Sequence, residues 1–199
     1  MESYVINLYG APGTGKSTLA AELFAELKKK NISTEITLEF AKELVYSEDK
    51  RLLCDQLIVL AEQYRRIFVL NKKVDFIITD SPVLLSIFYN RRNGSYHDPF
   101  FTEIALQAHE KFNNINFLLE RDFGYNSQGR NENEQEAEVI QSGIKNFFQQ
   151  KKIDFIQIEP YNAIEQIMKH IKYISKKRNF DFLAQNIKQI SLPVATEIN

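Results

Sequence analysis

Eight consecutive residues near the start of the chain match the pattern Gly-x-x-x-x-Gly-Lys-Ser/Thr, which suits the binding of nucleotide phosphates. Its glycines let successive backbone amides curl around an anion without a Cβ in the way. Lys16 would reach the outer phosphates, and the hydroxyl of Ser17 would take one place on Mg²⁺. Strand-type residues precede the pattern and helix-type residues follow it, so the positive end of a helix would face the phosphates. We therefore expect a nucleoside triphosphate to be bound by these residues: Gly10, Ala11, Pro12, Gly13, Thr14, Gly15, Lys16, Ser17 and Thr18.

Asp80 follows the largely apolar residues 76–79, which is the arrangement called Walker B. An acid at this position holds Mg²⁺, usually through its waters, so Asp80 and Ser17 are the predicted metal ligands. Asp80 and Lys16 are also predicted catalytic residues. The alternative interpretation of Asp80 is a helix cap at the end of a strand. The next residue is Ser81, whereas ATPases that drive motion commonly place a water-activating glutamate there, so the sequence favours phosphate transfer to another molecule.

Glu39 is the candidate general base or acceptor anchor, because it follows the second predicted strand and would face the phosphates across a cleft. Glu43 lies one helical turn further and is the second candidate for the same role. A surface glutamate that begins a helix is the alternative interpretation of Glu39.

The polar, glycine-containing segment 121–133 is expected to form a lid over the phosphates. Arginine suits a lid because its planar fork pairs with phosphate oxygens and keeps its charge during transfer. Arg130 is the first catalytic candidate in this segment and Arg121 the second. The alternative is an ordinary exposed loop.

The elements that must position these residues alternate between strands and helices, which predicts a three-layer α/β/α fold with a parallel sheet covered on both faces. Ligands collect beyond the carboxyl ends of such strands, where all the candidates lie. The predicted strands are about residues 3–9, 33–39, 74–79, 115–120 and 153–158. The predicted helices are a first one from about residue 19, one at 40–46, one long helix at about 52–68, two opened by Ser81-Pro82 and Asp98-Pro99, one near 134–150, and one opened by a capping box at Asn162.

Composition is ordinary for a soluble globular protein: the chain has 199 residues, 44% of them hydrophobic, and a net charge of −1. The bulk charge therefore does not indicate nucleic acid or a membrane as a partner. Cys54 is the single cysteine, which excludes an internal disulfide and predicts a cytoplasmic protein with an inert, buried thiol. We expect one domain over residues 1–175 and a C-terminal extension, partly helical or loose, over residues 176–199.

The chain resembles the P-loop nucleoside and nucleotide kinases, in particular the small kinases related to the ribosylnicotinamide kinase domain. The resemblance covers about residues 1–172 and rests on residues 10–17, Glu39 with Lys42-Glu43, residues 77–82 and Gly129-Arg130. It implies a strand order of 2-3-1-4-5, the use of ATP with Mg²⁺, and an acid after strand two that contacts the acceptor. The sequence departs from related lids by carrying Gln128 where an Asp is common, and it has no tryptophan.

Three functions are compatible with these residues. The leading hypothesis is a kinase that moves the γ-phosphate of ATP to a hydroxyl or phosphate of a nucleoside, nucleotide or similar small molecule. The second, motivated by basic doublets such as Arg65-Arg66, changes the acceptor to a nucleic-acid hydroxyl, on a strand end or a modified base. The third is a nucleotide-dependent switch or ATPase, although residues 71–75 resemble a guanine motif only at the wrong spacing. A homodimer is left open, and no membrane partner is expected.

Overall fold

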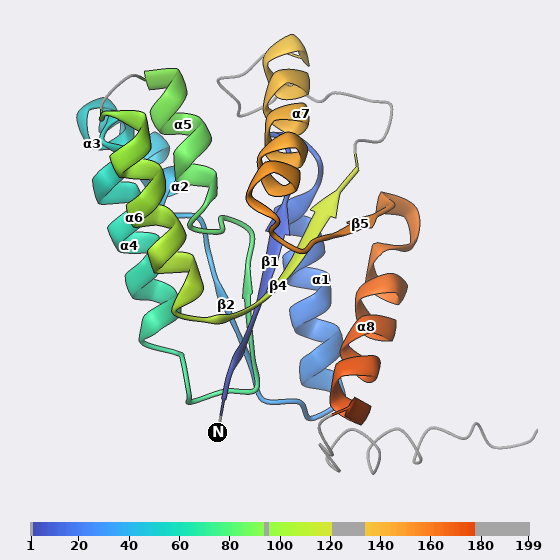
Figure 1. Ribbon diagram of the computed structural model, residues 1–199. Coiled ribbons are helices and arrows are strands. Elements are labelled where there is room, and N and C mark those ends of the chain that lie inside the picture. Colours follow the sequence, from blue (N-terminus) through green and yellow to red (C-terminus); the bar gives the residue numbers. More distant parts are fainter. Residues whose placement is uncertain (1, 94–95, 121–133, 178–199) are drawn as a thin grey trace, which may run out of the picture.

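The computed structural model describes residues 2–93, 96–120 and 134–177, and its centre is one parallel sheet (Figure 1). Its strands are β1 (Tyr4–Tyr9), β2 (Thr34–Thr37), β3 (Phe76–Thr79), β4 (Asn113–Leu119) and β5 (Ile156–Ile158). The strand order is β2-β3-β1-β4-β5 and every neighbouring pair is parallel. The three-layer fold and the order 2-3-1-4-5 are therefore confirmed, and each strand overlaps its predicted range.

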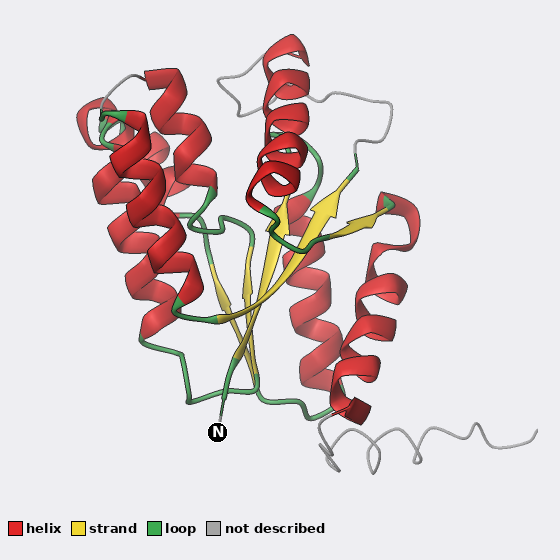
Figure 2. Ribbon diagram, viewed as in Figure 1, coloured by secondary structure: helices red, strands yellow, loops and turns green. Residues whose placement is uncertain are grey.

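Helices cover both faces of this sheet (Figure 2). Their bounds are α1 (Lys16–Lys29), α2 (Phe40–Tyr46), α3 (Lys50–Cys54), α4 (Gln56–Phe68), α5 (Leu85–Asn93), α6 (Asp98–Glu110), α7 (Glu134–Lys151) and α8 (Ala163–Lys177), with a 3₁₀ turn, η1, at Pro160–Asn162. Among the described residues, no helix has the length and apolar character needed to cross a membrane.

Alternation along the strands produces two separate hydrophobic cores. In β1, Ile6 and Leu8 pack in a cluster with α1 and α8, whereas Val5 and Tyr9 pack in a cluster with α4, α5, α6 and α7. Because successive side chains of a strand point to opposite faces, a strand that is buried on both faces reads as a continuous apolar run. The sheet is thus held between two helix layers, and its carboxyl edge is left to carry the loops (Figure 1).

Two predicted helix boundaries are wrong. The long helix predicted at about 52–68 is two helices, because the side chain of Asp55 accepts hydrogen bonds from the amides of Leu57 and Ile58 and caps a new helix there. Ser81 does not cap α5, which begins at Leu85. The amide of Leu85 instead bonds the carbonyl of Pro82 at 2.9 Å, as part of a tighter turn that buries residues 82–84.

The prediction of a buried thiol is also wrong, because Cys54 is exposed. Its apolar neighbours in sequence belong to α3, a short helix on the outside of the molecule with no buried residue. The helices at 40–46 and near 134–150 are confirmed, and α6 and α8 begin where the Pro99 and Asn162 signals place them.

Candidate active site

The loops that carry the candidate residues begin at one edge of the sheet and at nearly the same height. In the strand register, Thr79 lies opposite both Asn7 of β1 and Thr37 of β2. The phosphate-binding motif starts directly after β1, Asp80 directly follows β3, and Glu39 comes two residues after β2. The structure therefore brings the segments that carry these three candidates together at the carboxyl edge.

The first turn of the phosphate-binding loop requires glycine. Gly10 has a φ of +154°, and a Cβ built there would lie 2.7 Å from Thr14 Oγ1 and 3.2 Å from the carbonyl oxygen of Leu119. Gly15, at φ +85°, lies in the left-handed region and precedes the first turn of α1. No acidic side chain lies in that first turn, so its positive end is not offset by a carboxylate within the helix. The backbone there has the form of an anion cradle.

The cationic and hydroxyl groups of the motif lie around this cradle. Lys16 is half-buried, and its Nζ donates hydrogen bonds of 2.9 Å to the carbonyls of both Gly10 and Ala11. The loop's own carbonyls thus hold the ammonium beside the amides that a phosphate would contact. Ser17 and Thr18, at the start of α1, are exposed. They are therefore accessible to a nucleotide and its metal.

Asp80 combines deep burial with an unsatisfied oxygen. Its exposed fraction is 3%, and its Oδ1 receives no hydrogen bond from the residues that the structure describes. Burying a carboxylate oxygen without a hydrogen-bond donor costs free energy. Binding of a hydrated cation by Asp80 Oδ1, next to the phosphate cradle, would offset this cost. The residues present therefore fit Mg²⁺, which Asp80 and Ser17 would hold.

The two acidic candidates after β2 have different surroundings. Glu39 is half-buried and precedes α2 as its N-terminal flanking residue. Glu43 is exposed and forms an ion pair of 2.9 Å with Arg66. A hydrogen bond from the Arg66 side chain lowers the pKa of the Glu43 carboxyl. Glu43 thus takes part in an ion pair on the exposed side of α2, and the role of Glu39 or Glu43 as the base stays a prediction.

The sequence did not reveal the role of two glutamines, the buried Gln63 and the half-buried Gln141. The side chain of each connects a loop of the candidate site to a helix. Gln63 of α4 donates from Nε2 to Thr79 Oγ1 at 3.1 Å and accepts from the amide of Phe40 at 3.4 Å. Gln141 of α7 accepts from the amide of Ala11 at 2.8 Å and donates to the carbonyl of Leu119 at 2.9 Å. Both occupy positions in the apolar stripe of their helix, and that is the signal by which they could have been found. The flanking apolar residues are Leu60 and Ile67 for the first, and Ala137 and Ile144 for the second.

The predicted lid and its two arginines, Arg121 and Arg130, lie outside the described residues. Just before this segment, Glu120 accepts a hydrogen bond from the side chain of Gln157. The catalytic roles of both arginines therefore stay predictions.

Other charged or titratable groups, which could suggest a different chemistry, are held in ion pairs or buried. Arg65 and Arg66 both pair with Glu62, whose pKa is lowered to about 2, first by the hydrogen bond from Arg65. His109 is buried, and burial lowers the pKa of its imidazole to about 4. No group of three or more metal-ligating side chains occurs among the described residues. The pairing of Arg65 and Arg66 weakens the argument for this doublet as a nucleic-acid contact.

Comparison with known protein families matches residues 5–166 to the family described as AAA domain. Among solved structures, the fold is similar to that of deoxyadenosine kinase from M. mycoides, determined with the products dCMP and a flexible dCDP bound. The TM-score is 0.52 and the identity 18%, over 85% of this chain and 99% of that chain. Comparison with curated proteins found no match. The observed fold is therefore that of a P-loop kinase, whereas the narrower resemblance to ribosylnicotinamide kinase stays a prediction.

Proposed function

The chain belongs to the AAA domain family and has a P-loop kinase fold, and on this basis we propose that it is an ATP- and Mg²⁺-dependent kinase. Its acceptor is a hydroxyl or phosphate of a nucleoside, nucleotide or similar small molecule. Residues 10–18 hold the nucleotide, Ser17 and Asp80 hold the metal, and Glu39 accepts the proton of the acceptor hydroxyl. Arg130 and Arg121 neutralise charge on the transferred group. The reaction takes place in the cytoplasm.

The observation that supports the proposal is the buried Oδ1 of Asp80, which receives no hydrogen bond from any described residue and follows the strand paired with β1, which leads into the phosphate cradle. A carboxylate that only capped a helix would accept hydrogen bonds from that helix, whereas α5 begins five residues later. The residue that follows is Ser81 and not a water-activating glutamate. A metal ligand without a hydrolytic base beside it suits transfer to a second substrate better than hydrolysis.

The direct test supplies the purified protein with ATP, Mg²⁺ and a panel of nucleosides and nucleotides, and measures ADP together with the mass of the phosphorylated product. We expect at least one acceptor to raise ADP formation well above the rate without acceptor. Lys16→Ala should abolish this rate. If every acceptor leaves ADP formation at background while ATP still binds, the small-molecule kinase is excluded.

A pair of matched variants isolates the metal site. Asp80→Asn keeps the size of the side chain but removes the charge, so Mg²⁺-dependent turnover should fall by about 100-fold or more. Asp75→Asn makes the same change at the opposite end of β3, where the carboxyl group is half-buried and accepts a hydrogen bond from the backbone of Ser33. Asp75→Asn should leave turnover within about twofold. Equal losses in both variants would point to a structural role for Asp80.

The same measurements separate the other two hypotheses. An acceptor on nucleic acid predicts binding of DNA or RNA that weakens steeply with salt. A switch or ATPase predicts nucleotide binding or hydrolysis with no acceptor dependence at all. Light scattering of the purified chain tests for a homodimer.

A further inference from the structure

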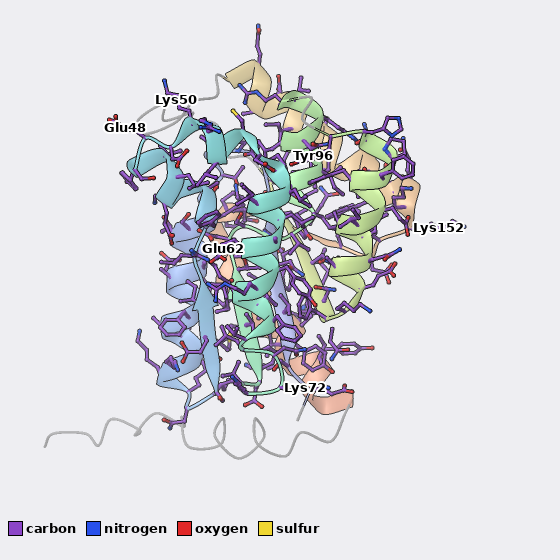
Figure 3. All side chains as sticks on the ribbon, turned by 90° about the vertical axis from the view of Figure 1, so that its left-hand side faces the viewer. Glu48, Lys50, Glu62, Lys72, Tyr96 and Lys152 are labelled. Atoms are coloured by element: carbon purple, nitrogen blue, oxygen red, sulfur yellow. The ribbon has the colours of Figure 1, made fainter. Side chains whose placement is uncertain are left out.

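Two side chains of α4 hold the backbone on both sides of Glu39. Nη1 of Arg66 donates to the carbonyl oxygen of Leu38 at 3.1 Å. Oε1 of Gln63 accepts from the amide of Phe40 at 3.4 Å. The guanidinium of Arg66 also lies over the ring of Phe40, 5.2 Å from its centre. The peptide groups before and after Glu39 are therefore both fixed to one helix, which faces the viewer in Figure 3.

The other end of the Gln63 side chain reaches the strand that carries Asp80. Its Nε2 donates to Thr79 Oγ1 at 3.1 Å, and the same hydroxyl oxygen accepts from the amide of Ser81 at 3.2 Å. Because a backbone amide can only donate, the contact with Phe40 fixes which end of the Gln63 amide is oxygen. The Gln63 side chain, in a residue that is 2% exposed, thus links the segment of Glu39 to Thr79, whose hydroxyl in turn binds the residue after Asp80.

Arg66 is itself held rigidly. Its Nε donates to Glu62 at 3.1 Å and its other nitrogens pair with Glu43 at 2.9 Å. Glu62, labelled in Figure 3, lies one turn before Arg66 on the same helix. Because two carboxylates hold the guanidinium of Arg66, its side chain loses little further conformational entropy when it binds the carbonyl of Leu38.

Apolar packing alone gives the Glu39 segment little support. Leu44 is the buried residue of α2, and Leu38 is 58% exposed. A short helix with so little buried surface opens locally at low cost unless polar contacts hold it. The contacts from α4 supply that support.

We propose that Gln63 and Arg66, which we call the α4 clamp, are positioning residues that set the distance and direction of Glu39 relative to Asp80. They act through the backbone of residues 38–40, to which both side chains are hydrogen-bonded. The catalytic consequence rests on the proposed kinase function, because it assumes that Glu39 acts on the acceptor. The clamp itself, as a constraint on this segment, does not depend on that function.

The test compares Gln63→Met and Arg66→Met with the control Arg65→Met. Arg65 is the neighbour of Arg66 and also pairs with Glu62, at 2.7 Å, but its hydrogen bonds go to Glu62 and not to residues 38–40. The first readout is the amide hydrogen exchange of Phe40, measured by NMR in the full chain. Loss of the Gln63 bond should speed this exchange by about 2–10-fold, since one hydrogen bond contributes that order of stability. Arg65→Met should leave it unchanged.

The second readout is steady-state kinetics with the best acceptor of the panel. Misplacement of a catalytic group by about 1 Å costs on the order of 100-fold, so kcat should fall roughly 10–100-fold in both clamp variants. The KM for ATP should stay within about twofold, because residues 10–18 are untouched. A general loss of structure would instead raise this KM and lower the melting temperature.

The two readouts separate failure of the clamp from failure of the function. If the wild-type chain phosphorylates no acceptor, the kinase proposal fails and the exchange of Phe40 still decides on the clamp. Unchanged exchange in Gln63→Met overturns the clamp, as does a kcat within twofold of Arg65→Met in folded clamp variants. A raised KM for ATP at constant kcat also overturns it. Should Gln63→Met not fold, the exchange of Phe40 and the kcat of Arg66→Met are compared with those of Arg65→Met, and unchanged values overturn the clamp.

Discussion

Replacement of Gly10 by alanine should damage the phosphate cradle more than any comparable change in a helix. The added Cβ would lie 2.7 Å from Thr14 Oγ1 and 3.2 Å from the carbonyl oxygen of Leu119. Thr14 would have to turn away, which breaks the bond of 3.1 Å that its hydroxyl donates to the carbonyl of Ala11. The alanine would also adopt a φ of +154°, which side-chain-bearing residues rarely do.

These costs can be added. The lost hydrogen bond contributes about 0.5–1.5 kcal/mol, and the unfavourable backbone about 1–3 kcal/mol, so the strain is about 3 kcal/mol. Without nucleotide the loop relaxes, and global stability falls by less than this amount. Binding of a nucleotide restores the cradle, so most of the strain should appear in the affinity, as a loss of roughly 100-fold.

The assay is titration with a nonhydrolysable ATP analogue and Mg²⁺, together with urea unfolding of the nucleotide-free protein. Gly143→Ala is the matched control, because its Cβ would lie 3.6 Å from the ring of Phe88, an ordinary contact, within α7. It should stabilise the protein by about 0.5–1 kcal/mol and leave affinity unchanged. An affinity within threefold of wild type in Gly10→Ala, with stability unchanged as well, would refute the steric argument.

Two further predictions concern α7 and the buried histidine. Gln141→Ala removes the tie between α7 and the cradle and should raise the KM for ATP about 3–10-fold, whereas Gln150→Ala, exposed on the same helix, should not. Burial lowers the pKa of His109 from 6.5 to about 4, so the unfolded chain binds a proton first as the pH falls. The contribution of neutral, buried His109 to the free energy of unfolding is fully present above pH 6.5 and is lost as the pH falls towards 4. The loss between pH 7.5 and pH 5 is about 2 kcal/mol. Urea unfolding should show that loss in the wild type and a smaller one in His109→Gln; equal slopes would contradict the assignment.

What could be predicted from the sequence is local. The phosphate cradle is a contiguous motif, and the strands are apolar runs bounded by turn residues, so neither depends on distant partners. The break at Asp55 was missed because the apolar spacing continues in phase across it, and only the capping side chain marks the new start. The wrong prediction of a buried Cys54 has the same cause, because apolar spacing that continues across Asp55 predicts one long helix with Cys54 inside it, whereas α3 is a separate helix with no buried residue.

The roles of Gln63 and Gln141 could not be predicted for a different reason. Their partners are distant in sequence: Ala11 and Gln141 are 130 positions apart, and Phe40 and Gln63 are 23 apart. A polar residue in an apolar stripe indicates a buried hydrogen bond but not its partner. Which loops they hold becomes visible only when the helices are placed on the sheet.

These two helices give the site a common support. Gln141 fixes the loop of the phosphate donor to α7, and Gln63 fixes the segment of the candidate base to α4. Both helices belong to the same layer, where Leu60 of α4 and Ile144 of α7 share one core cluster. The sheet sets the height of the loops, and in the proposed kinase the packing within this layer would set the distance between the phosphate-binding loop and Glu39. Substitutions between α4 and α7 should therefore alter kcat even where they touch neither substrate, because close-packed cores transmit strain.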